Sequence, residues 1–133
     1  MKRILLITLV ALLGIFAVSA VAPGEKVGVS FPETVFDFGT VKQTDKDVTH
    51  EFEMTVTGKS PVAIVSANAS CGCTRPKFEP KPTEPGKSTK IFVRFIPRGQ
   101  KGEINKSVRV RLKNGEGKSE SVTLRIKGVV VPE

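Results

Sequence analysis

The chain has 133 residues, with 21 Lys and Arg against 13 Asp and Glu and a formal net charge of +8. This length is enough for one domain with its own hydrophobic core. Trp and Tyr are absent, so the aromatic platforms typical of sugar-binding and single-strand-binding proteins would have to come from phenylalanine alone.

Residues 1–20 have the pattern of an export signal. Two basic residues precede an apolar run over residues 4–18, and small residues lead to Ala20. The run is short for a membrane span and no basic stop-transfer cluster follows it. We therefore predict cleavage after Ala20, an exported protein in the periplasm or outside the cell, and one mature domain over residues 21–133. The alternative is that the signal is retained as a membrane anchor. If the signal is cleaved, the protein contacts the membrane only through the signal peptide before cleavage.

The predicted mature chain carries its charge unevenly. Residues 21–60 contain 4 basic and 7 acidic side chains, whereas residues 61–133 contain 15 basic and 6 acidic ones. This asymmetry permits an anionic partner without requiring one.

The dominant period after the signal is two, which is the period of β-strands. One column of the stretch from Val48 to Thr57 holds Val48, His50, Phe52, Met54 and Val56, and the intervening residues are Thr or Glu. The same alternation occurs over residues 108–113 and 122–127, with Asn114-Gly115 beginning the loop of a predicted hairpin between them. Shorter strand candidates are residues 27–31, 34–38, 62–68 and 89–96. Outside the signal no stretch has a helical stripe.

About seven short strands separated by turns predict an all-β fold, a single immunoglobulin-like β-sandwich preceded by a signal-peptide helix. Lysines and prolines are expected to blunt its edge strands. Residues 75–87 contain four prolines and are predicted to be an extended, helix-free connection.

Both cysteines lie in the stretch Ser70-Cys71-Gly72-Cys73-Thr74. An exported protein meets an oxidising compartment, which favours a disulfide. An extended tripeptide separates its outer Cα atoms by about 6.6 Å, so Gly72 must bend the chain for the bond to form. Such a small loop would stabilise the fold by only about 1.6 kcal/mol, so this bond would be easily reduced. Arg75 and Lys77 nearby would favour thiol reactivity.

Two other interpretations of Cys71 and Cys73 remain open. Paired thiolates could hold a cuprous ion, which accepts few ligands. Zinc requires four ligands. His50 and Met54 cannot both complete such a site, because four positions along a strand separate them by about 13 Å. Alternatively both cysteines serve a tight turn and pack as small apolar residues. In that case His50 is a half-buried core residue and Met54 fills the core.

No stretch predicts an enzyme or a bound cofactor. The two Gly-Lys-Ser tripeptides lack the upstream glycine of a phosphate loop, and a single histidine leaves few choices of base. We expect a non-enzymatic module that acts by contact, with a small thiol redox or Cu(I)-handling protein using Cys71 and Cys73 as the alternative.

The predicted hairpin carries cations on its outward columns, namely Arg109, Arg111, Lys113, Arg125 and Lys127. A solvated, solubilising face would explain them. The functional interpretation is docking on an anionic partner, either an acidic protein or the envelope surface. Nucleic acid is not expected, because no aromatic side chain interleaves the columns.

Several motifs together resemble the bacterial secreted family known as domain of unknown function 1573. They are Val35-Phe36-Asp37-Phe38-Gly39-Thr40-Val41, Ser70-Cys71-Gly72-Cys73-Thr74, Glu84-Pro85-Gly86-Lys87 and the closing Leu124-Arg125-Ile126-Lys127-Gly128-Val129. The resemblance covers residues 34–130 and implies an immunoglobulin-like domain of the major-sperm-protein and pilus-chaperone kind. It implies no activity. The turn at residues 58–61 departs from the family pattern, in which an asparagine is expected.

Overall fold

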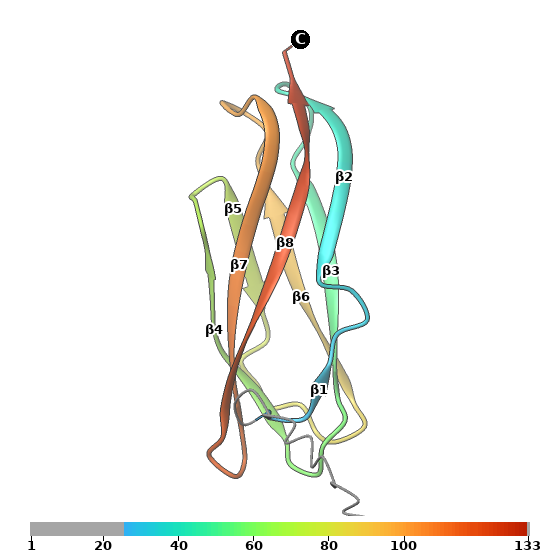
Figure 1. The fold of residues 1–133 in the computed structure, drawn as a ribbon, viewed down its shortest axis with the longest axis vertical. Coiled ribbons are helices and arrows are strands. Elements are labelled where there is room, and N and C mark those ends of the chain that lie inside the picture. Colours follow the sequence, from blue (N-terminus) through green and yellow to red (C-terminus); the bar gives the residue numbers. More distant parts are fainter. Residues whose placement is uncertain (1–25, 133) are drawn as a thin grey trace, which may run out of the picture.

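Eight strands form two four-stranded sheets that pack face to face in the computed structural model, which describes residues 26–132 (Figure 1). The strands are β1 (Val29–Ser30), β2 (Val35–Lys42), β3 (Val48–Val56), β4 (Val62–Ala69), β5 (Thr74–Phe78), β6 (Ser88–Phe95), β7 (Gly102–Asn114) and β8 (Ser119–Val131). One sheet has the order β1-β3-β6-β5 and the other β2-β8-β7-β4. The predicted all-β sandwich is confirmed, and the predicted signal helix lies outside the described residues. Within residues 26–132 no helix is long and apolar enough to cross a membrane.

The core lies between the sheets and is built from the apolar columns that the alternation predicted. On β3 the side chains of Phe52, Met54 and Val56 are buried, while Glu51 and Glu53 face solvent. The matching columns of the other sheet are Val108, Val110 and Leu112 on β7 and Leu124 and Ile126 on β8. Because successive strand residues point to opposite faces, each of these strands puts its polar residues on the outside.

β7 and β8 form the predicted hairpin, in register from Gly102 opposite Val130 to Lys113 opposite Ser119. The side chain of Asn114 closes its loop, since Oδ1 accepts hydrogen bonds from the backbone N–H groups of Glu116 (3.0 Å) and Lys118 (2.9 Å). Gly117 has φ +86°, a conformation that glycine adopts without steric cost. The local chemistry of the loop therefore fixes the register of the two longest strands.

The prediction of an extended connection over residues 75–87 missed one strand. Thr74–Phe78 forms β5 at the edge of the β1-β3-β6-β5 sheet. Pro76 sits in this strand opposite Val93. Proline has no N–H to donate, so it is tolerated on an edge strand whose other side has no partner. The proline that obscured this strand in the sequence also blunts the sheet edge.

β2 runs parallel to β8 and brings the Phe38 ring over Gly128. Phe38 stacks on the buried Phe95 with ring centroids 5.0 Å apart, so it joins the edge of one sheet to the other sheet. A Cβ atom added at Gly128 would overlap ring carbons of Phe38. Gly128 is therefore needed for this close approach between β2 and β8.

We expect Gly128→Ala to lower the free energy of unfolding by about 1–3 kcal/mol, because the Phe38 ring must leave its place against Phe95. Gly115→Ala is the matched control, since its Cβ would meet Pro61 Cδ at an ordinary 3.6 Å. Urea denaturation of both variants provides the measurement. Equal urea midpoints for the two variants would contradict this expectation, because β2 would then shift away from residue 128 without loss of stability.

Candidate functional site

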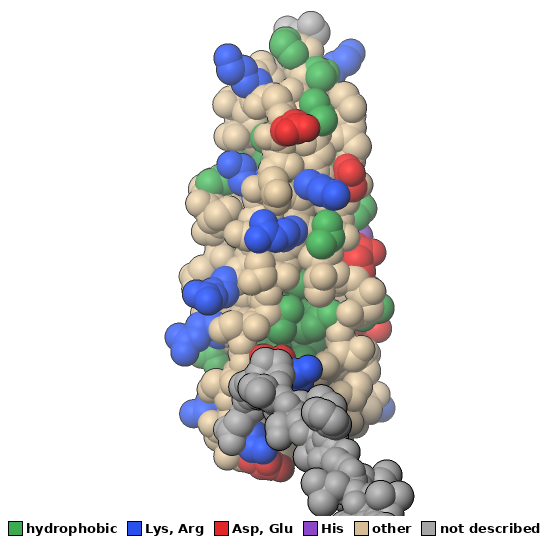
Figure 2. All heavy atoms as spheres, in the orientation of Figure 1, with side chains coloured by type: hydrophobic (Ala, Val, Ile, Leu, Met, Phe, Trp, Pro, Cys, Tyr) green, Lys and Arg blue, Asp and Glu red, His purple; other side chains and the backbone are tan. Residues whose placement is uncertain are grey.

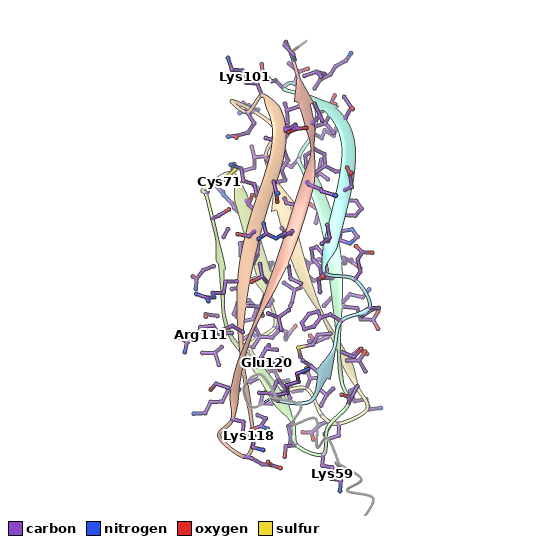
Figure 3. All side chains as sticks on the ribbon, in the orientation of Figure 1. Lys59, Cys71, Lys101, Arg111, Lys118 and Glu120 are labelled. Carbon is purple, nitrogen blue, oxygen red and sulfur yellow. A yellow bond between two sulfur atoms is a disulfide. The ribbon has the colours of Figure 1, made fainter. Side chains whose placement is uncertain are left out.

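The Ser70–Cys73 loop carries the chain from β4, an edge strand of one sheet, to β5, an edge strand of the other. Figure 3 places Cys71 on this connection, toward the opposite end of the sandwich from Lys118 in the β7–β8 loop. Cys71 and Cys73 are joined by a disulfide with their Cα atoms 5.4 Å apart. Gly72 thus provides the bend that the sequence required for this bond.

Backbone and hydroxyl groups surround the two sulfur atoms. The Cys73 N–H donates to Cys71 Sγ at 3.2 Å. The Oγ1 atom of the buried Thr74 lies 4.0 Å from Cys71 Sγ and 3.7 Å from Cys73 Sγ. Both cysteines are half-buried, and Cys73 packs against the core. Thr74 is a member of the site that sequence reasoning missed; its adjacency to the cysteines was the only signal.

Two of the three interpretations of the cysteines have a counterpart in the structure. It contains the bridge, and Cys73 also packs as the third interpretation expected. Among the described residues no three His, Cys, Asp or Glu side chains cluster as metal ligands. His50 is half-buried elsewhere, stacked on Phe36 with ring centroids 3.7 Å apart, and its Nε2 lies 2.6 Å from Glu33 Oε1. Within residues 26–132, the ion-pair and aromatic contacts of His50 are with Glu33, Phe36 and Phe52, and none of them is with the disulfide.

The five predicted cations all lie on the outer face of β7 and β8, and all are exposed. The pairing register places a neutral residue directly opposite each one: Thr123 opposite Arg109, Ser121 opposite Arg111, Ser119 opposite Lys113, Ser107 opposite Arg125 and Asn105 opposite Lys127. We call these five residues the basic band, because they run diagonally along the hairpin instead of forming one compact cluster.

In the part of the chain that the structure describes, the basic band has no carboxylate partner. Within residues 26–132 none of its members forms an ion pair, and the Arg125 guanidinium donates instead to Asn105 Oδ1 at 3.3 Å. Figure 2 shows Lys and Arg side chains spread down the face that carries β7 and β8, with acidic side chains along the β2 side and toward both ends of this face. Arg111 projects outward on the β4 side of this face (Figure 3). The band is therefore a positively charged surface open to solvent.

A second surface, which sequence reasoning missed, is a hollow of about 510 Å³ on the outer face of the other sheet. Its lining includes Phe92, which is 38% exposed, with Arg75, Lys77 and Arg94 around it. Arg75 stands directly opposite Arg94, whose Nε contacts Asp47 Oδ2 at 3.0 Å. Pairing of β5 with β6 creates this hollow, so recognition of β5 as a strand was needed to find it.

On the same outer face, β3 carries acidic side chains, opposite in charge to those of β5. Glu51 on β3 bonds Lys90 on β6 at 2.9 Å, and this contact raises the pKa of Lys90 above its ordinary value. The outer face thus changes from acidic at β3 to basic at β5. This gradient distinguishes it from the uniformly basic band.

A family model described as protein of unknown function (DUF1573) matches residues 29–130. No functionally curated protein matches the sequence. Similar solved structures include a PapD-like domain of human CEP192, with TM-score 0.67, 14% identity, and coverage of 85% of this chain and 94% of that one. A Caenorhabditis elegans major-sperm-protein family member has TM-score 0.55 at 8% identity, with 80% and 100% covered.

The VesB protease of Vibrio cholerae is also similar, with TM-score 0.62 and 13% identity over 76% of this chain. The match spans only 31% of the VesB chain. At these identities the likenesses establish the fold, and they confirm that it is the immunoglobulin-like kind seen in PapD-like and major-sperm-protein domains.

Proposed function

The chain belongs to the DUF1573 family of proteins of unknown function, and from this premise we propose that it is an exported, non-enzymatic binding module. Its binding surface is the basic band, and its partner is an anionic surface of the cell envelope or of an acidic protein. The observation that carries the proposal is the band of five exposed cations without a carboxylate partner in the described chain.

The arrangement of the band supports an extended, electrostatic contact. β7 and β8 are each 13 residues long, so a flat partner can meet several cations at once. Residues of opposite charge across strands would stabilise a sheet that only faced water, yet the band lacks them. Each Lys or Arg near an anionic membrane surface contributes about 1 kcal/mol of binding free energy.

Two features support export. The pattern of residues 1–20 is that of a signal peptide. The Cys71–Cys73 disulfide is a bond of the kind that forms in oxidising compartments outside the cytosol. An exported module with a basic face would meet anionic envelope surfaces once it has left the cytosol.

Non-enzymatic action is supported by the surroundings of the single histidine. The His50 ring is held between Phe36, which stacks on it, and Phe52, which meets it edge-on at 4.8 Å. This aromatic cluster with Glu33 gives the histidine a packing role in the sandwich.

The test is sedimentation with vesicles that contain anionic lipid, against neutral vesicles as background. We expect Arg109→Gln/Arg111→Gln/Arg125→Gln to bind about a hundredfold more weakly than the wild type, because about 3 kcal/mol of attraction is lost. The matched control is Lys59→Gln/Lys81→Gln/Lys101→Gln, which removes the same charge from exposed loop positions that are not members of the band.

Equal binding by the wild type and both triple variants would contradict the role of the band for a membrane surface. The same three proteins are then compared on an immobilised acidic protein matrix. If the wild type and both variants also bind the acidic matrix equally, the cations of the band only keep the chain soluble.

A further inference from the structure

The Cys71–Cys73 disulfide closes a ring of only three residues, at sequence separation 2. In the chain-entropy model such a short loop stabilises the folded state less than a longer loop does. Binding and folding are linked reciprocally, so a bond that stabilises the fold weakly is stabilised weakly by the fold. The fold therefore protects this disulfide against reduction less than it protects a bond that closes a long loop.

The two sulfur atoms are not equivalent. Both cysteines lie half-buried in the loop between the sheets, but only Cys73 packs against the core, and Cys71 lies on the outer part of the loop (Figure 3). An incoming thiolate therefore meets Cys71 first. Cys73 is the leaving sulfur, and the Thr74 hydroxyl 3.7 Å away can donate to the thiolate that forms on it. The Cys73 N–H, 3.2 Å from Cys71 Sγ, can stabilise a thiolate on Cys71 in the same manner.

From these contacts we propose that Cys71–Cys73, apart from the basic band, is a thiol–disulfide exchange site. As a stoichiometric oxidant and not a turning-over enzyme, it passes its disulfide to a pair of thiols on another exported protein. One partner thiolate attacks Cys71 Sγ; the Cys71–Cys73 bond breaks and Cys73 leaves with the electron pair. The second partner thiolate then attacks the partner sulfur of the mixed disulfide, and Cys71 leaves. The partner loses two electrons and two protons and gains a disulfide, and both protons end on Cys71 and Cys73.

The hollow on the outer face of β5 and β6, which follows the disulfide along the chain, selects the substrate. Arg75, two residues after Cys73, and Lys77 lie on its rim, and the exposed Phe92 ring lies between them and β3. An acidic segment with one apolar side chain fits this surface, because carboxylates can pair with the cations while the apolar group covers Phe92. The substrate class is thus a protein dithiol flanked by acidic residues.

The first test measures exchange directly. The purified oxidised protein is equilibrated in glutathione buffers of graded ratio, quenched with acid, alkylated and weighed by mass spectrometry. We expect Cys71–Cys73 to become reduced in buffers that leave the disulfides of a secreted protein with long closed loops intact. Resistance equal to that control protein would overturn the proposal.

The second test assigns the roles of the two sulfurs. Cys73→Ser leaves Cys71 as the only thiol, and Cys71→Ser leaves Cys73. We expect Cys71 to form a mixed disulfide with oxidised glutathione at least about tenfold faster than Cys73, because Cys73 is packed against the core. Equal rates, or a faster Cys73, would contradict the assigned direction of attack.

Thr74 is a positioning residue in this account, and its test separates chemistry from packing. We expect Thr74→Val to slow reduction of the disulfide by about tenfold, because the Cys73 thiolate loses a hydrogen-bond donor. Thr74→Ser keeps the hydroxyl and should retain the wild-type rate, while urea midpoints report any structural cost separately. If Ser slows exchange as much as Val, Thr74 acts only through packing.

Substrate choice is tested with two dithiol peptides that differ only in whether Glu or Lys flanks their cysteines. We expect the oxidised protein to oxidise the Glu peptide several-fold faster, and Arg75→Gln/Lys77→Gln to abolish the difference. Equal rates for both peptides with the wild type would refute selection by the hollow.

Discussion

Replacement of Val110 by aspartate is expected to lower the free energy of unfolding by about 5 kcal/mol, which would leave a domain of this size largely unfolded. Val110 is 0% exposed at the centre of its sheet, opposite Val122 on β8 and Ala67 on β4. A carboxylate there would lose its hydration, and no Lys or Arg among residues 26–132 is buried in the sandwich to pair with it. Far-UV circular dichroism and urea denaturation provide the measurement.

Arg109→Asp is the matched control, because it places the same carboxylate one residue earlier in the strand. Arg109 is exposed on the outer face, so we expect a change in stability within about 0.5 kcal/mol. A shift of one residue in register would exchange the two outcomes. If Arg109→Asp unfolds the chain and Val110→Asp does not, the strand faces are assigned the wrong way round.

Phe52→Ala should lower the free energy of unfolding by about 3–5 kcal/mol, through lost apolar burial and the cavity left behind. Phe52 is 1% exposed on β3 and contacts the His50 ring edge-on. Its loss would also remove one wall of the cluster that holds His50. Urea denaturation, with the slope compared between variant and wild type, measures the effect.

The contrasting variant is Cys71→Ser/Cys73→Ser, for which we expect a loss of at most about 1–2 kcal/mol. Its three-residue loop constrains little of the unfolded chain. If this double variant were as destabilised as Phe52→Ala, the disulfide would be a structural staple, and its proposed role in exchange would lose its basis.

Much of the sandwich could be predicted from the sequence, because alternation decides which face of a strand is buried. The columns of β3, β7 and β8 alternate over at least three apolar residues each, and the structure buries the expected side. The Asn114-Gly115 loop likewise identified the hairpin, since its turn chemistry is local. These features need no knowledge of distant residues.

Features that depend on partners far along the chain could not be predicted. The parallel pairing of β2 with β8 joins residues about ninety positions apart, and nothing in either strand specifies the other. β5 reads as a loop because Pro76 lies within it, and only pairing with β6 makes it a strand. The hollow around Phe92 was missed for the same reason.

The candidate site divides in a similar way. Sequence indicated which cations face outward, but the register of β7 against β8 decided that Arg109 faces Thr123 and Arg125 faces Ser107. That register spreads the basic band along the sheet. The cysteine pair was evident from sequence, whereas the packing of Cys73 and the position of Thr74 between both sulfurs required the fold.

The most direct test of the proposed binding surface is residue-resolved NMR of the wild-type protein during titration with anionic lipid vesicles or an acidic protein. The account predicts that amide signals of β7 and β8 around Arg109, Arg111 and Arg125 change first, and that added salt reverses the change. Changes confined to the outer face of the β1-β3-β6-β5 sheet, with the β7–β8 signals unaffected, would contradict it.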